Sequence, residues 1–194
     1  IALIRNSRGS NFPNLIQVAQ DCERFGAQGI TVHPRPDERH CKFADLPELK
    51  AVCTTEFNIE GFPSRHFIDE VIKVKPHQCT LVPDDPNQIT SDHGWDTIKH
   101  QSFLKEIIQE LNKEKIRVSL FMDAEAKMIE NAAKAGADRI EYYTGPYAKN
   151  YEINPENAIK EIRETCFIAI QNDLGINAGH DLNLDNLKYL KDNL

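Results

Sequence analysis

The sequence lacks the features that mark secreted, membrane and zinc-binding proteins. None of its hydrophobic runs approaches the ~18 apolar residues of a membrane span, and the amino terminus has no secretory signal pattern. The five cysteines are scattered along the chain and never form a C-x-x-C pair, which argues for reduced thiols rather than disulfides or a zinc site. We therefore expect a cytoplasmic protein with no membrane partner.

Short motifs of several enzyme classes are also missing. The sequence contains neither G-x-G-x-x-G nor G-x-x-x-x-G-K-[ST], the glycine-rich loops that bind nucleotide phosphates. It has no G-x-S-x-G nucleophile elbow and neither the H-x-H nor the H-E-x-x-H spacing of metal sites. We expect no metal site and no hydrolysis through a serine nucleophile.

Positive charge is scarce. The chain has 30 acidic residues against 23 lysines and arginines, which gives a net charge of −7. This balance is the opposite of that in nucleic-acid-binding proteins, so we expect no nucleic acid partner and a local site for any anionic ligand. Because 194 residues with 40% hydrophobic content can bury one sizeable core, we expect a single domain over residues 1–194.

Helical periodicity alternates with short apolar runs along the chain. Apolar residues recur at i, i+3, i+4 and i+7 from Leu15 to Cys22, and Gly26 after them is typical of a helix end. The segments GAQGI (26–30) and GADRI (136–140) each join such a helix to the next strand. This internal similarity indicates repeated βα units.

The apolar runs predict strands at residues 30–32, 56–60, 78–82, 117–121, 139–143 and 175–178. The first is a β-branched run typical of a strand buried on both faces. Helices are predicted between the strands, with Pro155 in the first turn of one and Leu184, Leu187 and Leu190 in another. The alternation predicts an α/β fold with a mostly parallel sheet. An open sheet normally carries a glycine-rich phosphate loop, so we favour a (β/α)₈ TIM barrel, typically ~250 residues, with two units missing.

Acid–base residues stand at the ends of four predicted strands: His33, Glu60, Glu141 and His180. In a barrel these strand ends face one mouth, where catalytic residues gather. Histidine titrates near pH 7 and a desolvated glutamate can be raised toward it, so such a set suits multi-step carbonyl chemistry. Taken singly, each is more readily explained as a satisfied or solvated polar residue, and it is the four together that indicate an active site.

Other side chains near these ends could bind phosphate. A guanidinium fork matches phosphate oxygens, so Arg5, Arg8 and Arg35 could clamp phosphate groups, or they could be ordinary surface charge. Thr90 offers a hydroxyl near the same mouth, although a capping or turn role is equally natural for it.

Seven motifs carry a resemblance that covers essentially the whole chain. LIRNSRG, GITVHPRPDERH, FNIEG, KPHQCTLVP with ITSDHGWD, VSLF, RIEYYTGPYA and INAGHDLN occur in an order and spacing that resemble the pyridoxine 5′-phosphate synthase family. The resemblance implies a (β/α)₈ barrel that condenses 1-deoxy-D-xylulose 5-phosphate with 3-amino-2-oxopropyl phosphate to pyridoxine 5′-phosphate, phosphate and water. It also implies no metal or organic cofactor and a homo-octamer.

The resemblance further implies catalytic roles. His33, Glu60 and His180 correspond to acid–base groups, and Glu141 to a residue that supports the transition state. We expect the segment 83–95 to close over the substrates as a lid, because water must be excluded from reactive imines.

Substrate contacts follow from the same resemblance. Arg35, His40 and Thr90 are expected to hold the deoxyxylulose phosphate. Arg8 is expected to hold the phosphate of the amino ketone, together with the backbone of Asp181, where some family members carry glycine.

The family pattern extends beyond this sequence. Its first strand, with an Asn and further substrate contacts, is expected before Ile1, and its last strand, with a Gly-His phosphate contact, after Leu194. Six strands cannot close a barrel, so we expect segments of a longer protein to be missing and this exact chain to be inactive or unfolded. Two alternatives stay open: another phosphosugar-handling barrel enzyme, such as an isomerase or aldolase, and a non-catalytic phosphate-binding module.

Overall fold

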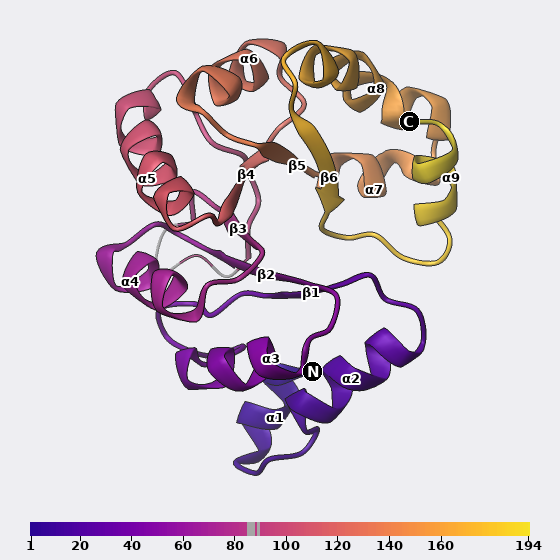
Figure 1. Cartoon of the computed structure of the whole chain (residues 1–194). Coiled ribbons are helices and arrows are strands. Elements are labelled where there is room, and N and C mark those ends of the chain that lie inside the picture. Colours follow the sequence, from indigo (N-terminus) through magenta and orange to yellow (C-terminus); the bar gives the residue numbers. More distant parts are fainter. Residues whose placement is uncertain (85–87, 89) are drawn as a thin grey trace. The chain divides into compact units, whose positions relative to one another are not determined.

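The computed structural model describes residues 1–84, 88 and 90–194 (Figure 1). The contacts within the chain divide it into two compact units. Unit 1 comprises residues 1–89 and 111–117, and unit 2 comprises residues 90–110 and 118–194. The expected single domain remains a prediction. Among the described residues, no helix is long and apolar enough to cross a membrane.

Unit 1 alternates helices with parallel strands. Its elements are α1 (Ala2–Arg8), α2 (Leu15–Arg24), β1 (Gly29–Val32), the 3₁₀ turn η1 (Phe43–Asp45), α3 (Leu46–Val52), β2 (Glu56–Gly61), α4 (Arg65–Val74) and β3 (Gln78–Leu81). β2 pairs in parallel with β1 and with β3, and Ile59 on β2 is opposite both Val32 and Cys79. Phe57 and Ile59 are fully buried, so β2 forms the centre of this unit's core.

Local sequence signals set the ends of the helices in unit 1. The side chain of Asn14 accepts a hydrogen bond from the N–H of Gln17 and caps α2, and Ser64 caps α4 in the same way. After α2 the chain turns at Gly26, whose φ of 103° suits glycine. The predicted glycine stop of this helix is therefore confirmed.

The expectation that β1 is buried on both faces is wrong. Ile30 and Val32 are only half-buried, and Gly29 and Thr31 are exposed. Among the described residues of unit 1, β1 has a strand partner, β2, on one side only. The β-branched run therefore predicts a strand here but does not predict how deeply it is buried.

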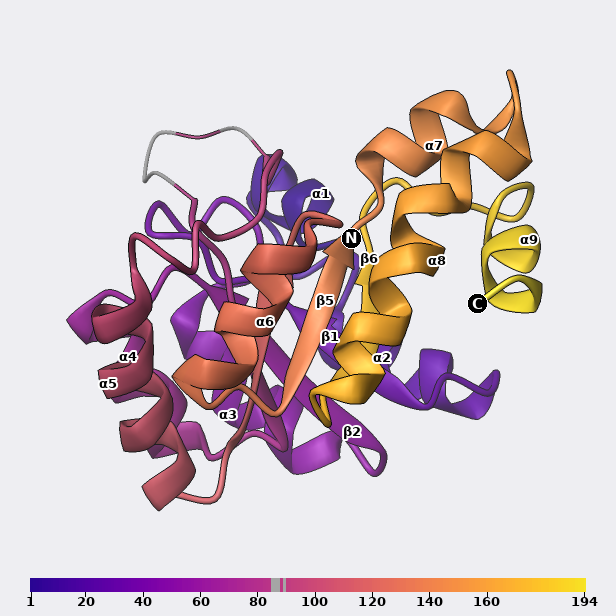
Figure 2. The ribbon, with the colours of Figure 1, turned by 90° about the horizontal axis from the view of Figure 1, so that it is seen from above.

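Unit 2 repeats the same alternation. Its elements are α5 (Gln101–Lys113), whose residues from Leu111 belong to unit 1, β4 (Arg117–Met122), α6 (Ala126–Ala135), β5 (Arg139–Tyr143), α7 (Gly145–Tyr151), α8 (Pro155–Gln171), β6 (Gly175–Gly179) and α9 (Leu187–Asp192). β5 pairs in parallel with β4 and with β6. Figures 1 and 2 show α6 and α8 on the same side of β5 and β6. Ile140 and Tyr142 of β5 are fully buried.

The predicted α/β fold class is confirmed, with parallel strands alternating with helices as in a partial (β/α)₈ barrel. The predicted strands lie within a residue or two of the observed ones, and Pro155 opens α8 as expected. The last predicted helix is present as α9, but Leu184 precedes it and is 95% exposed. The five cysteines are all free.

Candidate active site

His33 and Glu60 lie side by side at the carboxyl ends of β1 and β2. The register pairs Val32 with Ile59, so the residues that follow each of these are neighbours. Nδ1 of His33 lies 4.0 Å from Oε2 of Glu60, and the two side chains are 17% and 19% exposed. Burial and nearby positive charge, first that of Arg35, lower the pKa of His33 to about 3. The imidazole is therefore neutral at pH 7.

Cationic side chains gather beyond β1. Arg35 is 4% exposed, and its guanidinium lies 2.9 Å from Oδ2 of Asp84. Arg35 and Arg39 both donate to the carbonyl oxygen of Gln88, at 2.9 and 2.6 Å. Burial, then the charges of Arg35 and Arg39, lower the pKa of the half-buried His40. Despite the net negative charge of the chain, this part of unit 1 is locally suited to an anion.

Arg5 and Arg8 meet different surroundings. Arg5 is 7% exposed, and its guanidinium donates to both carboxylate oxygens of Asp45, at 2.8 and 2.7 Å. Arg5 is therefore a buried, paired side chain and not the ordinary surface charge that was one of the two interpretations of it. Arg8 is exposed at the end of α1 and remains a candidate for phosphate.

In unit 2, His180 is held between two polar side chains. Its Nε2 lies 3.0 Å from the hydroxyl of Thr90, and its Nδ1 lies 2.8 Å from Oδ2 of Asp181. The carboxylate of Asp181 accepts here, so Nδ1 carries a proton, and Nε2 faces the hydroxyl of Thr90. Thr90 is thus placed beside a predicted catalytic residue.

The backbone and aromatic neighbours of His180 fix its position. The buried Thr144 donates its hydroxyl to the carbonyl oxygens of Gly179 and His180. The ring of Tyr143 meets that of His180 edge-on at 5.3 Å, and Phe121 lies 6.5 Å from it. His180 has a φ of 88°, so its backbone is in the left-handed region and depends on such contacts.

Glu141 lies in the middle of β5 rather than at its end, so its predicted place at a strand end is wrong. It pairs with Asn177 of β6, and its side chain is half-buried. A Cβ added to Gly179 would lie 2.3 Å from Oε1 of Glu141. Because Gly179 has no side chain, the space beside it is open to the Glu141 carboxylate.

The predicted lid, residues 83–95, is only partly described, because residues 85–87 and 89 lie outside the described residues. Its carboxyl end is anchored to β4 and the residue after it. The N–H of Trp95 donates to the carbonyl of Phe121, and the N–H of Gly94 donates to the carboxylate of Asp123, both at 2.9 Å. Trp95 is 4% exposed, so this end is part of the core of unit 2.

The structure brings the predicted residues together in two sets. His33, Glu60, Arg35 and His40 gather in unit 1, and His180 with Thr90 and Asp181 in unit 2. In the described part of the chain, histidine, cysteine, aspartate and glutamate side chains form no group of three that could hold a metal ion.

Three neighbours of these sets are not predicted from the sequence. Arg39 belongs to the charged run after β1, and that charge was a usable signal. Asp84 and Tyr143 acquire their places through contacts with Arg35 and His180, which are distant in the sequence. No local sequence pattern predicts contacts between residues that are so far apart in the chain.

Comparison with protein families matches residues 1–194 to the family described as pyridoxal phosphate biosynthesis protein PdxJ. A protein of Cytophaga hutchinsonii is 60% identical over 194 residues, which are all of this chain and 82% of that protein. Proteins of Bacteroides thetaiotaomicron and Flavobacterium johnsoniae are 56% and 53% identical, with the same coverage. Each of the three is named pyridoxine 5′-phosphate synthase.

A solved structure, mandelate oxidase with 3,3-difluoro-2-hydroxy-3-phenylpropionic acid, resembles this chain in fold. The TM-score is 0.57 at 9% identity, over 83% of this chain and 56% of that one. At so low an identity the likeness concerns the fold alone.

Proposed function

Because the chain belongs to the family of the pyridoxal phosphate biosynthesis protein PdxJ, we propose that it acts as a pyridoxine 5′-phosphate synthase. The reaction joins 1-deoxy-D-xylulose 5-phosphate and 3-amino-2-oxopropyl phosphate to give pyridoxine 5′-phosphate, phosphate and water. The observation that carries this proposal is the 60% identity, over all 194 residues, to a protein of that name. The acid–base residues found in both units support it.

The chemistry requires several proton transfers. The amine nitrogen of one substrate forms a C=N bond to the ketone carbon of the other and water leaves; loss of phosphate and an aldol-type ring closure follow. His33, neutral at pH 7, or its neighbour Glu60 takes the early protons. His180 serves as a proton donor when the ring becomes aromatic, and Glu141 supports the transition state.

The phosphate groups are assigned to separate residues. Arg35, His40 and Thr90 hold the deoxyxylulose phosphate, and Arg8 with the backbone of Asp181 holds the phosphate of the amino ketone. Pairing of Arg35 with Asp84 supports this assignment, because it fixes the guanidinium before a ligand arrives. Binding two phosphorylated substrates together supplies proximity, which can lower a barrier by up to ~7–11 kcal/mol.

The proposal extends to the setting of the enzyme. We propose that the enzyme acts in the cytoplasm as a homo-octamer. Its reaction needs neither a metal nor an organic cofactor. The predicted lid spans residues 83–95, and the hydrogen bonds of Gly94 and Trp95 give the carboxyl end of that segment a fixed point.

Incubation of the purified full-length protein with both substrates tests the activity. Pyridoxine 5′-phosphate should appear by absorbance and mass spectrometry only when both substrates are present. Conversion of a single substrate would instead indicate an isomerase or aldolase, and binding without conversion a phosphate-binding module. His33→Ala should lower turnover far more than it weakens substrate binding, and an unchanged turnover would remove His33 from the mechanism.

A further inference from the structure

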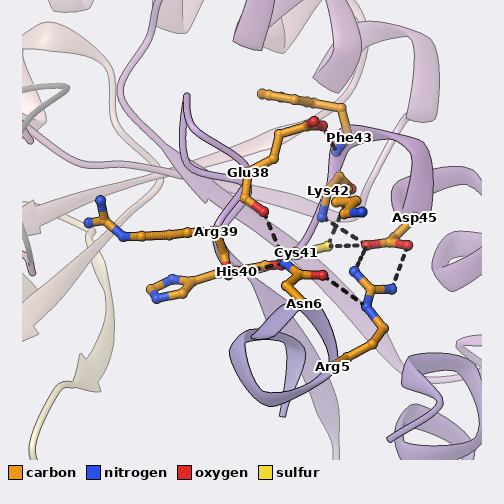
Figure 3. A network of polar contacts seen from close by, with 9 residues as sticks. All are labelled: Arg5, Asn6, Glu38, Arg39, His40, Cys41, Lys42, Phe43 and Asp45. Atoms are coloured by element: carbon orange, nitrogen blue, oxygen red, sulfur yellow. Dashed lines mark hydrogen bonds and ion pairs between the residues drawn. The ribbon is translucent and has the colours of Figure 1, made fainter. Parts of the chain in front are cut away.

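Asn6 of α1 points its amide group at the backbone of the loop that carries His40. Residues 38–42, the His40 loop, present three successive carbonyl oxygens to Nδ2 of Asn6 (Figure 3). The distances to the oxygens of Glu38, Arg39 and His40 are 3.0, 3.0 and 2.6 Å. One side chain on α1 thus supplies donors to three consecutive peptide groups of a loop.

The orientation of the Asn6 amide is itself fixed. Nε of Arg5 donates to Oδ1 of Asn6 at 3.2 Å, so the oxygen is turned to Arg5 and the NH₂ group to the loop. Arg5 in turn holds Asp45 with its two terminal nitrogens. Burial works against the charge on Asp45, but the hydrogen bonds from Arg5 and Lys42 lower its pKa, so the carboxylate stays ionised.

The far end of the loop is tied to the same network. The N–H of Lys42 donates to Oδ2 of Asp45 at 2.8 Å, and the N–H of Phe43 donates to Oε1 of Glu38 at 2.9 Å. Glu38 has a φ of 53°, a left-handed conformation that a non-glycine residue adopts at a cost. The conformation of the loop therefore depends on side-chain contacts. One of these is the hydrogen bond from Asn6 to the carbonyl oxygen of His40 itself.

We infer that Asn6 is a positioning residue that sets the backbone of the His40 loop and so aims His40 at the deoxyxylulose phosphate. This inference rests on the proposed function, which gives His40 its ligand. Asn6 touches no substrate in this account. It acts by sharing the two N–H bonds of its amide among three carbonyl oxygens, and its partner Arg5 acts by keeping the amide turned toward them.

Asn6→Asp tests the inference with almost no change in shape. One carboxylate oxygen can still accept from Arg5, but the other then faces three carbonyl oxygens and repels them. The KM for 1-deoxy-D-xylulose 5-phosphate should rise about tenfold or more, because the variant loses the hydrogen bonds to the loop and gains repulsion between oxygen atoms in their place. The turnover number and the KM for 3-amino-2-oxopropyl phosphate should change little. Asn6→Ala, which removes the donor without adding charge, should shift the same KM less.

Asn14→Asp is the matched control, because the same exchange at the exposed cap of α2 keeps an acceptor for Gln17. Amide hydrogen exchange gives a readout independent of activity: the N–H groups of Lys42 and Phe43 should exchange faster in Asn6→Asp, and those of α4 should not.

Equal rises in the KM of both substrates, or an unchanged KM for the sugar phosphate in both Asn6 variants, would overturn the inference. A wild-type protein that binds neither substrate would instead contradict the proposed function, while the exchange result would still report on the loop.

Discussion

Three arginines that are equal candidates for phosphate binding in the sequence have different surroundings in the structure. Arg5 is paired with Asp45, Arg35 is paired with Asp84 and shares an acceptor with Arg39, and Arg8 is exposed. Because a guanidinium has several donors, a paired arginine can still act, either by binding a ligand with its free edge or by ordering its neighbours. Burial and partners, rather than residue type, therefore separate a positioning arginine from a ligand-binding one.

Replacing His33 with Gln should make the free energy of unfolding less sensitive to acid. The pKa of His33 falls from 6.5 to about 3 on folding, so between these values the unfolded chain binds a proton that the folded chain does not. The stability present above pH 6.5 is therefore lost progressively as the pH falls, by at most about 2 kcal/mol at pH 5. Urea unfolding at pH 7.5 and pH 5 measures this difference.

His66→Gln, at an exposed position of α4, is the control for the acid experiment. If wild type and His33→Gln lose equal stability between the two pH values, the neutral, buried state assigned to His33 is incorrect.

Asp181→Asn should lower turnover by about threefold to tenfold, a modest effect because the carboxylate is 55% exposed and solvent screens it. The carboxylate keeps a proton on Nδ1 of His180, and an amide that can turn either way no longer fixes that state. Steady-state kinetics at saturating substrate measures the change. Asp185→Asn, in the same exposed loop, should keep the wild-type rate; equal rates in both variants would remove Asp181 from the positioning of His180.

At the scale of elements, the sequence predicts what has local periodicity and misses what does not. The β-branched and apolar runs located the strands, and the helix from Leu15 followed from its spacing. The seven-residue helices α1, α3 and α7 were not predicted, because two turns show too little periodicity.

The site was predicted where a residue stands at a strand end, and not where a distant partner decides its place. The sequence placed His33, Glu60 and His180 at or next to strand ends, and the structure agrees. It could not give the burial of Arg5 or the contacts of Asn6, since their partners lie more than thirty residues away. The assignment of roles came from the family resemblance, and those roles remain proposals.

Gly179→Ala should impair turnover while leaving the fold stable. The added Cβ would meet the carboxylate of Glu141 at 2.3 Å, and that carboxylate is the end of a flexible side chain that can move away. If Glu141 supports the transition state, its displacement should cost roughly tenfold or more in turnover, with thermal unfolding nearly unchanged.

Gly175→Ala is the matched control on the same strand. Gly175 lies at the other end of β6, and its added Cβ would press on the side chain of Arg139 on β5 rather than on that of Glu141, so turnover should stay at the wild-type level. Wild-type turnover in Gly179→Ala would show that the position of the Glu141 carboxylate does not matter.

At the scale of the whole molecule, charge is distributed unevenly. The chain carries a net charge of −7, yet His33 and His40 both experience Arg35 and Arg39 as close positive neighbours. Attraction of phosphorylated substrates must therefore come from these local cations and not from the overall field, which repels anions. For the same reason, a net negative charge argues against a nucleic-acid surface but does not argue against anionic substrates.

Removal of metal ions should leave the wild-type reaction intact. All atoms of the two substrates reappear in pyridoxine 5′-phosphate, phosphate and water, so the proposed reaction needs no oxidant or reductant. Its steps move protons, and histidine and glutamate can supply each transfer, so turnover after EDTA treatment and desalting should stay within about twofold of the untreated rate. The assay is then repeated with added Mg²⁺, because a divalent cation could also assist departure of the phosphate. A large loss on chelation that Mg²⁺ restores would show that acid–base residues alone do not carry the reaction.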